Sequence, residues 1–213
     1  YSRHPGSLYR VFIRLGYRKK VESTKKKSKH NGHYDTPTEL GIKWQMDVKY
    51  VPYVCYVGTD GEKFYQYTML EEASRKRFIY AYKENSSHST IDFVQRAIIF
   101  FGYAPETIQT DHGGEFTHTQ KTNRVHPFDI LCNKLHITHK VLRPRTPWHN
   151  GKVERSHRND QERFYNHLSF YSYDDLQVQM KRYLYRSNNI PMSVLGWKTP
   201  NQKQYELENI IYI

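Results

Sequence analysis

The alternation of apolar and polar residues predicts β-strands in the first half of the chain. Residues 43–50 include Trp44-Gln45-Met46-Asp47-Val48, a pattern typical of a strand that places Asp47 in its middle. Further runs with β character lie at 54–57, 64–70 and 77–82. The first two of these flank Thr59-Asp60-Gly61, which favours a hairpin turn. We therefore expect three antiparallel strands in succession.

Helical spacing of apolar residues becomes common further along. We expect a helix that begins at Ser89-Thr90-Ile91-Asp92, where Asp92 completes a capping-box pattern, and ends at Gly102. A strand should end at Asp111. The remaining predicted elements are a short helix around 128–135, a strand at 139–142, a helix over about 151–168 and a helix from Ser172. This order favours a mixed central β-sheet with helices on both faces, an α/β fold.

The same patterns divide the chain into four segments. An amphipathic helix over 7–17 indicates that residues 1–17 are the remnant of an upstream helix-turn-helix DNA-binding domain. Residues 18–41 are interpreted as a basic linker and residues 42–200 as the folded core. Residues 201–213 are interpreted as a C-terminal tail, for which we predict no defined element.

Positive charge is concentrated in the N-terminal part of the chain and indicates the kind of partner that the protein binds. The formal net charge is +12, and residues 1–35 alone hold ten Lys/Arg against two acids. Such an excess favours nucleic acid first and an anionic membrane surface second. No stretch has the apolar length of a membrane helix, and Cys55 and Cys132 are spaced as reduced core cysteines. We expect a cytoplasmic protein of a bacterium, associated with the nucleoid when it acts.

Three carboxylates stand where the predicted elements could bring them together. Asp47 lies on the first strand, Asp111 ends the strand after the first long helix, and Glu154 lies one turn into the helix that follows the last strand. Carboxylates repel one another unless a cation neutralises them, and oxygen ligands suit Mg²⁺ or Mn²⁺. Two such ions can activate a water or hydroxyl nucleophile at a phosphodiester. Their convergence is an inference from element order.

The residues around these acids resemble the catalytic core of DDE transposases, which are related to retroviral integrases. The resemblance is especially to bacterial insertion-sequence transposases of the IS3 and IS481 type. The matching segments are Trp44-Gln45-Met46-Asp47-Val48, Thr110-Asp111-His112-Gly113-Gly114-Glu115-Phe116, and Arg143-Pro144 followed by His149-Asn150-Gly151-Lys152-Val153-Glu154-Arg155. The likeness covers about residues 40–200, and the third segment is the most specific.

The resemblance implies an RNase H-like fold and a metal-binding catalytic triad of Asp47, Asp111 and Glu154. It also implies Mg²⁺ or Mn²⁺ as cofactor, in two ions, and DNA strand cleavage and transfer without a covalent enzyme intermediate. The implied partners are element ends and target DNA, with a homo-oligomer on the DNA and no membrane. Two departures from the family pattern are the long interval between Asp111 and Glu154, which a surface insertion at 117–125 absorbs, and His112 in place of an asparagine.

Basic residues on either side of the third motif are candidates for phosphate contact. On a helix, such cations also form ordinary ion pairs with neighbours, so a solvated helical face is the simpler alternative. Phosphate contacts position DNA without reading its sequence. The predicted DNA-binding residues are Lys140, Arg143, Arg145, Asn150, Lys152, Arg155 and Arg158.

Other interpretations of the same residues stay open. Glu115 follows a glycine pair and could touch metal, although it is better explained as a residue that fixes the turn. Asp60 and Asp92 are assigned to a hairpin turn and a helix cap. The chain as a whole could be a DNA-binding transposase remnant that has lost catalysis, or an RNase H-like nuclease acting on RNA–DNA hybrids.

Overall fold

The computed structural model describes residues 5–17, 36–58, 61–142 and 150–210. The chain divides into two compact units, Tyr1–His33 and Tyr34–Ile213. The first unit contains helix α1, Pro5–Arg14, on which Leu8 and Phe12 are exposed. The second unit contains all the other helices and strands. Most of the predicted linker, including residues 18–35, lies outside the described residues.

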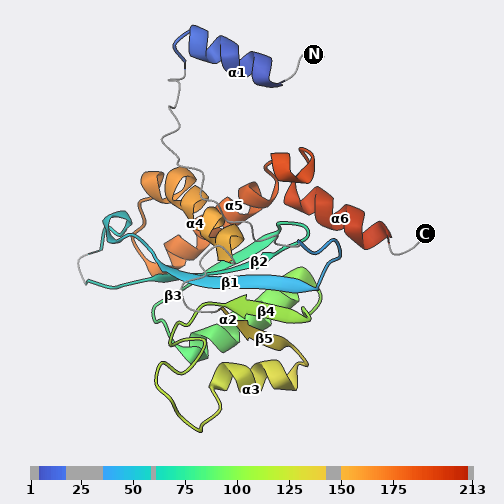
Figure 1. Ribbon diagram of the computed structural model, residues 1–213. Helices are drawn as coiled ribbons and strands as arrows, with labels where there is room; N and C mark the ends of the chain where they lie inside the picture. The colour runs from blue at the N-terminus through green and yellow to red at the C-terminus, as the bar shows by residue number, and fades with distance from the viewer. Residues whose placement is uncertain (1–4, 18–35, 59–60, 143–149, 211–213) are drawn as a thin grey trace. The chain divides into compact units, whose positions relative to one another are not determined.

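The second unit is built on a mixed five-stranded sheet (Figure 1). Its strands are β1 Lys43–Tyr50, β2 Tyr65–Glu71, β3 Arg77–Tyr82, β4 Thr107–Thr110 and β5 Thr138–Val141. Their order is β3-β2-β1-β4-β5. The first three strands are antiparallel, whereas β4 runs parallel to β1 and β5 parallel to β4. The prediction of three leading antiparallel strands in a mixed sheet is confirmed.

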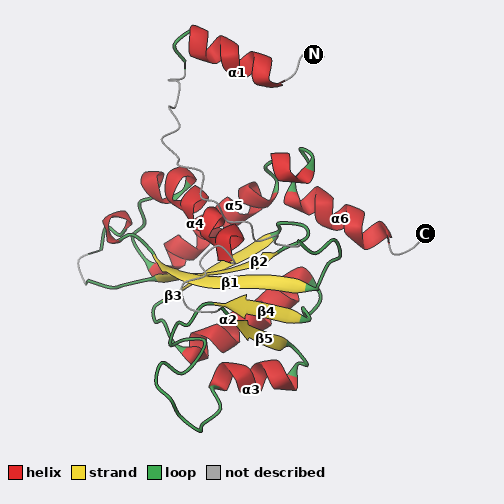
Figure 2. Cartoon of the chain, viewed as in Figure 1, coloured by secondary structure: helices red, strands yellow, loops and turns green. Residues whose placement is uncertain are grey.

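Helices cover both faces of this sheet (Figure 2). They are α2 Ser87–Phe101, α3 Pro127–Lys134, α4 Gly151–Arg163, α5 Tyr173–Asn188 and α6 Pro200–Ile210, with 3₁₀ turns at Tyr53–Cys55, Tyr165–His167 and Ser193–Leu195. Helices α2 and α3 lie on one side, and α4 and α5 on the other. None of the helices in the described ranges combines the length and apolar character needed to span a membrane.

The strands divide their side chains between two hydrophobic cores. On β1, Trp44 and Met46 pack with α2 and α3, as do Tyr67 and Met69 of β2. The second core gathers side chains of β3, α5 and the residues after α4, and contains Phe164. Between β1, β2 and α4 the buried strand positions are polar instead, with Gln45, Gln66 and Thr68 fully buried. Such a polar interior needs a specific set of partners.

The predicted strand at 54–57 is wrong. Residues Tyr53–Cys55 form a 3₁₀ turn, and Tyr56 makes only an isolated bridge to Phe170. Pro52 lies at the start of this turn, where a missing N–H disfavours regular strand pairing. β2 therefore pairs with β1 across a longer connection, whose residues 59–60 lie outside the described ranges together with the predicted Asp60 turn.

The helix boundaries also differ from prediction at the start of α2 and at the end of α4. Ser86, not Ser89, caps α2 and accepts a hydrogen bond from the Ser89 N–H at 3.2 Å. Asp92 is no cap, because it accepts hydrogen bonds from Tyr82 and Arg96, each at 2.6 Å. Helix α4 ends at Arg163, where a 3₁₀ turn follows.

The predicted tail contains helix α6. Its start is a reciprocal capping box, since the Gln202 N–H donates to Thr199 Oγ1 at 3.1 Å and the Thr199 N–H donates to Gln202 Oε1 at 2.9 Å. Pro200 occupies the first helical position, where its lack of an N–H costs nothing. The Thr-Pro-Asn-Gln segment carried this signal in the sequence.

Candidate active site beneath helix α4

Asp47 and Asp111 lie on neighbouring parallel strands. β1 pairs with β4 in a register that sets Gln45 opposite Gln109. The same offset, carried two residues further, places Asp47 level with Asp111, which directly follows β4. Neighbouring strands lie about 5 Å apart. The two aspartates therefore lie on adjacent strands at the end of β4.

Helix α4 brings Glu154 to the same face of the sheet. Gln45 and Asp47 are two residues apart on β1 and point to one side. Gln45 Oε1 accepts a hydrogen bond from the backbone N–H of Val153 at 3.1 Å. That N–H belongs to the first turn of α4, whose N-cap residue Asn150 makes no side-chain capping bond. Gln45 thus caps the helix from the sheet and holds the residue next to Glu154.

Glu72 extends this contact into a buried ion-pair cluster. Gln45 Nε2 donates to Glu72 Oε1 at 2.8 Å, and the Lys43 ammonium lies 3.4 Å from the same oxygen. Lys152 of α4 pairs with the other carboxylate oxygen. Because Glu72 is fully buried, these partners offset the cost of withdrawing its charge from water. Burial lowers the pKa of Lys152 to about 8, against the favourable contact with Glu72.

The surroundings of Asp47 oppose its negative charge. Its pKa is raised to about 7, first by burial and then by the carboxylates of Asp111, Glu154 and Glu115. One hydrogen bond, from the Val48 N–H to Asp47 Oδ1 at 2.8 Å, lowers the pKa of Asp47 and partly offsets these effects. Coulombic effects weaken with distance, so all four acids occupy one neighbourhood. The sequence interpretation had set Glu115 aside as a turn residue, and here its charge acts on Asp47.

The imidazole ring of His157 lies within ion-pair distance of the Asp47 carboxylate. Its Nδ1 lies 3.4 Å from Asp47 Oδ2, and its Nε2 hydrogen bonds with Thr68 Oγ1 at 2.9 Å. Burial lowers the pKa of His157 to about 4, so the ring is neutral at pH 7 and adds no positive charge. His157 was not among the predicted site residues, although it lies three residues after Glu154 and therefore on the same helical face.

The donor set suits a hard divalent cation, which would lower the pKa of Asp47 and relieve the repulsion among the acids. Within the described ranges, however, no three His, Cys, Asp or Glu side chains form a ready-made metal-ligand group. Asp111 and Glu154 are exposed at this site. Their side chains must therefore adjust before they and Asp47 can hold one ion together.

The predicted DNA-binding residues differ in their exposure to solvent. Lys140, Arg155 and Arg158 are exposed, as phosphate contact requires. Asn150 is buried, whereas Lys152 is partly exposed and pairs with the buried Glu72. Arg143 and Arg145 lie outside the described residues.

Comparison with known proteins identifies the family of this chain. Residues 37–147 match the family model described as integrase core domain, and residues 135–200 match a second model with the same description. The first match alone covers just over half of the chain. The chain belongs to the integrase core domain family.

Two relatives are similar in sequence to this integrase core. The ORF3 protein of Spiroplasma virus SpV1-C74, a provisionally named integrase, is 29% identical over 183 residues, which are 82% of this chain and 49% of that protein. A retrovirus-related Pol polyprotein from transposon TNT 1-94 of Nicotiana tabacum is 29% identical over 100 residues, which are 46% of this chain and 7% of that protein. The chain thus spans at most about half the length of these relatives.

Solved structures share its fold. A chain of the simian T-cell lymphotropic virus intasome in complex with PP2A regulatory subunit B56 gamma superimposes with a TM-score of 0.62 at 20% identity, covering 82% of this chain and 58% of that one. The bovine immunodeficiency virus (BIV) integrase core gives 0.60 at 21% identity, covering 81% and 99%. The HTLV-2 integrase core, a complex with magnesium, gives 0.57 at 21%, covering 78% and 97%. The predicted RNase H-like fold is confirmed.

Proposed function

We propose that this chain is the catalytic domain of a DDE transposase or integrase, which cleaves a DNA strand and joins the freed 3′-hydroxyl to target DNA. The observation that carries the proposal is the cluster of acids around Asp47, whose pKa is raised to about 7 in a member of the integrase core domain family. Carboxylates gathered against their own repulsion favour a site that works with a cation.

The proposed metal ligands are Asp47, Asp111 and Glu154. Glu115 is proposed to assist them, because its carboxylate is close enough to raise the pKa of Asp47. The proposed cofactor is Mg²⁺ or Mn²⁺, in two ions; the magnesium of the HTLV-2 integrase core supports this choice. When bound, such ions activate the attacking water or hydroxyl and stabilise the leaving oxygen of the phosphodiester. The protein's own part is to hold the ligands: Gln45 fixes the start of α4, and neutral His157 lies against Asp47.

Lys140, Arg155 and Arg158 are proposed to contact DNA phosphates near this site. Each is exposed, and the whole chain has a formal net charge of +12. Phosphate contacts of this kind give affinity and register without sequence specificity. The proposed partners are the ends of a mobile element and the target DNA.

The finer assignment is a bacterial insertion-sequence transposase that acts as a homo-oligomer on nucleoid DNA in the cytoplasm. The motif around Glu154 favours this branch of the family. The HTLV-2 integrase core occurs in dimeric and trimeric forms, and an intasome is among the structural neighbours, which supports assembly on DNA.

The test is strand cleavage and strand transfer on an element-end duplex in Mg²⁺, with DNA binding measured in parallel. Asp111→Asn and Glu154→Gln should each abolish both reactions while binding changes little, because they remove metal ligands rather than phosphate contacts. Glu162→Gln is the matched control, since Glu162 is an exposed acid further along α4. Full activity of either triad variant would refute the assignment.

One observation favours a second candidate, a DNA-binding protein without catalysis: the described residues contain no ready-made group of three metal ligands. The wild-type chain, assayed in Mn²⁺ with precleaved and uncleaved ends, distinguishes the two. Joined products support the transposase, whereas tight binding with no joined or cleaved product supports the second candidate. A preference for RNA–DNA hybrid cleavage would instead indicate an RNase H-like nuclease.

A further inference from the structure

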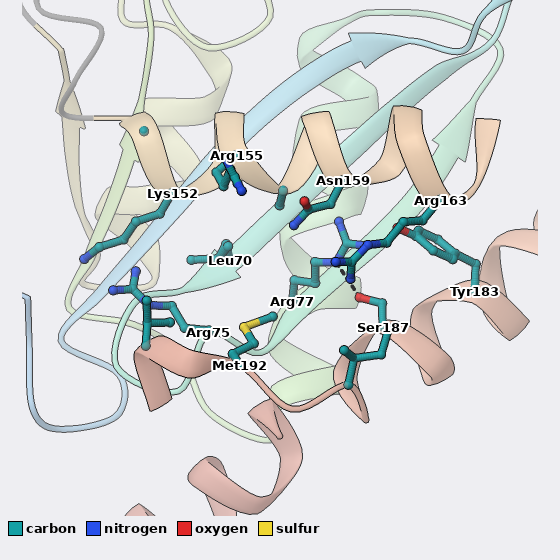
Figure 3. Close-up of a pocket in the computed structure, with 14 residues that line it drawn as sticks. Leu70, Arg75, Arg77, Lys152, Arg155, Asn159, Arg163, Tyr183, Ser187 and Met192 are labelled. Atoms are coloured by element: carbon teal, nitrogen blue, oxygen red, sulfur yellow. Dashed lines mark hydrogen bonds between the residues drawn. The ribbon is translucent and has the colours of Figure 1, made fainter. Parts of the chain in front are cut away.

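A pocket of about 250 Å³ opens along one flank of α4 (Figure 3). Helix α4 forms one wall, and the end of α5 with residues 190–194 forms the other. Leu70 and the residues that follow β2 lie at its base. Pockets for drug-sized ligands measure roughly 300–1,000 Å³. We call this space the α4–α5 pocket, and its size suits one nucleotide-sized group rather than a folded partner.

Positive charge gathers around the α4–α5 pocket. Its cationic lining residues are Arg75, Arg77, Lys152, Arg155 and Arg163, and none of the described residues that line it is Asp or Glu. Two of these charges are already compensated, because Arg77 pairs with Asp160 and Lys152 with Glu72. Arg155 and Arg163 form no ion pair with any residue of the described ranges. The pocket therefore favours an anionic ligand.

Four further lining residues are apolar, beside the polar side chains of Ser156, Asn159 and Ser187. Leu70, Ile190, Met192 and Val194 contribute aliphatic or thioether surface. Tyr183 also borders the space, but its ring stacks on Phe164 with centroids 4.5 Å apart, so it is a fixed wall. A ligand that fits both parts has a flat or apolar body and a negative group beside it. An unpaired nucleotide, with its base and phosphate, has this composition.

The pocket adjoins the candidate active site through α4 itself. Glu154 lies between Lys152 and Arg155 in the chain but does not line the pocket. Successive residues turn by about 100° around a helix whose full diameter is about 10–12 Å. A strand that crosses α4 from the acids therefore reaches the pocket within one helix width.

We propose that the α4–α5 pocket is a second DNA-binding site, which takes one unpaired nucleotide of the DNA substrate. The base contacts Met192 and Leu70, and the phosphate is held at Arg155 and Arg163. Guanidinium groups suit this role because they stack on bases and bind phosphate in a bidentate manner. This inference rests on the proposed function, since DNA must already occupy the neighbouring site. That continuity favours a nucleotide over an acidic peptide, which would meet the same charges.

The test compares the binding of three labelled DNA duplexes at fixed salt and without divalent metal. The first duplex has blunt ends, and the second ends in one to three unpaired nucleotides. The third has the same unpaired end, but its unpaired sugars carry no base. Because a base that enters the pocket buries apolar surface against Leu70 and Met192, the unpaired end should bind about 10-fold more tightly than the blunt or abasic ends. Met192→Glu and Arg163→Glu should each remove this preference. Blunt-end affinity should stay within about twofold of wild type for Met192→Glu and within about twofold of the charge-matched control for Arg163→Glu.

Two controls make the result specific. Arg182→Glu changes charge identically at an exposed position of α5 outside the pocket, so it is the reference for Arg163→Glu and should keep the preference. 2-Aminopurine at the unpaired position should change its emission on binding to wild type but not to Met192→Glu. Equal affinity for all three duplexes would overturn the proposal, as would displacement by a Leu/Glu peptide but not by a deoxynucleoside monophosphate. Binding is measured without catalysis, so neither result depends on the triad variants.

Discussion

Asp47 and Asp160 are two carboxylates withdrawn from solvent in the same layer, between the sheet and α4, and their pKa values shift in opposite directions. Asp160 is fully buried, and the side chain of Asp47 is 19% exposed. Burial alone would raise the pKa of both. The neighbours of each residue decide the difference.

Asp160 is surrounded by donors. Arg77 Nη1 lies 2.6 Å from one oxygen, which also accepts from the Tyr183 hydroxyl at 2.9 Å, and Gln66 Nε2 donates to the other at 2.8 Å. Burial raises the pKa of Asp160, but Arg77 and the hydrogen bonds outweigh it and leave the pKa below its ordinary value. This is a compensated charge that fastens α4 to β2, β3 and α5.

Asp47 has acids where Asp160 has donors. Asp111, Glu154 and Glu115 add to the effect of burial, and the adjacent His157 is neutral at pH 7. The comparison teaches that burial of a carboxylate does not by itself mark a functional site. The mark of such a site is a carboxylate whose negative charge the neighbouring groups oppose instead of compensating.

The largest expected effect follows Asp47→Asn. Strand transfer in Mg²⁺ should fall by about 10³-fold or more, which corresponds to roughly 4 kcal/mol in the activation barrier. Gel assays of joined product measure it, with Glu162→Gln as the control on α4. Activity within tenfold of wild type would make Asp47 a structural residue like Asp160.

Asp160→Asn should have the largest effect on stability. It leaves the buried Arg77 without its carboxylate, and breaking a buried pair in this way costs about 3–5 kcal/mol. Urea unfolding at pH 7 measures the free energy, and Glu162→Gln should change it by less than about 0.5 kcal/mol. A loss below 1 kcal/mol would show that Tyr183 and Gln66 suffice without charge compensation.

The pH dependence of stability should separate the two aspartates. In metal-free wild type, Asp47 holds its proton up to about pH 7 when folded but loses it near pH 4 when unfolded. The folded state then binds more protons, so the free energy of unfolding falls as pH rises between these values. Asp47→Asn should therefore stabilise the chain by about 2 kcal/mol more at pH 8 than at pH 5. Denaturant titrations in EDTA measure it, and a pH-independent difference would contradict the shift.

The smallest expected effect concerns the hydrogen bond by which Gln45 of β1 holds the start of α4. Gln45→Ala removes the sheet-borne cap of α4 and should cost about 1–2 kcal/mol of stability. Because Gln45 positions Glu154 indirectly, the Mg²⁺ concentration for half-maximal activity should rise, and excess Mg²⁺ should restore most of the rate. Gln95→Ala, an exposed glutamine on α2, is the control. Loss of stability without a change in Mg²⁺ dependence would limit Gln45 to a structural role.

Local pattern was sufficient for much of the scaffold. The alternation around Trp44-Gln45-Met46-Asp47 predicted β1 with its observed bounds, and Asp111 follows β4 as expected. Errors arose where a local signal was overridden or overlooked. Pro52 precedes a 3₁₀ turn in place of the expected strand, and the Thr199–Gln202 capping box that begins α6 was not recognised.

The sequence by itself determined which faces of the strands and helices carry acids, because alternation and helical periodicity are local properties of the backbone. Only the tertiary structure decided which acids are compensated. Gln45 meets Val153 across 108 positions, and Arg77 meets Asp160 across 83, through the parallel pairing of β1 with β4 and the packing of α4 on the sheet. Burial and charge act through space, so the raised pKa of Asp47 and the lowered pKa of Asp160 depend on that topology rather than on neighbours in the chain.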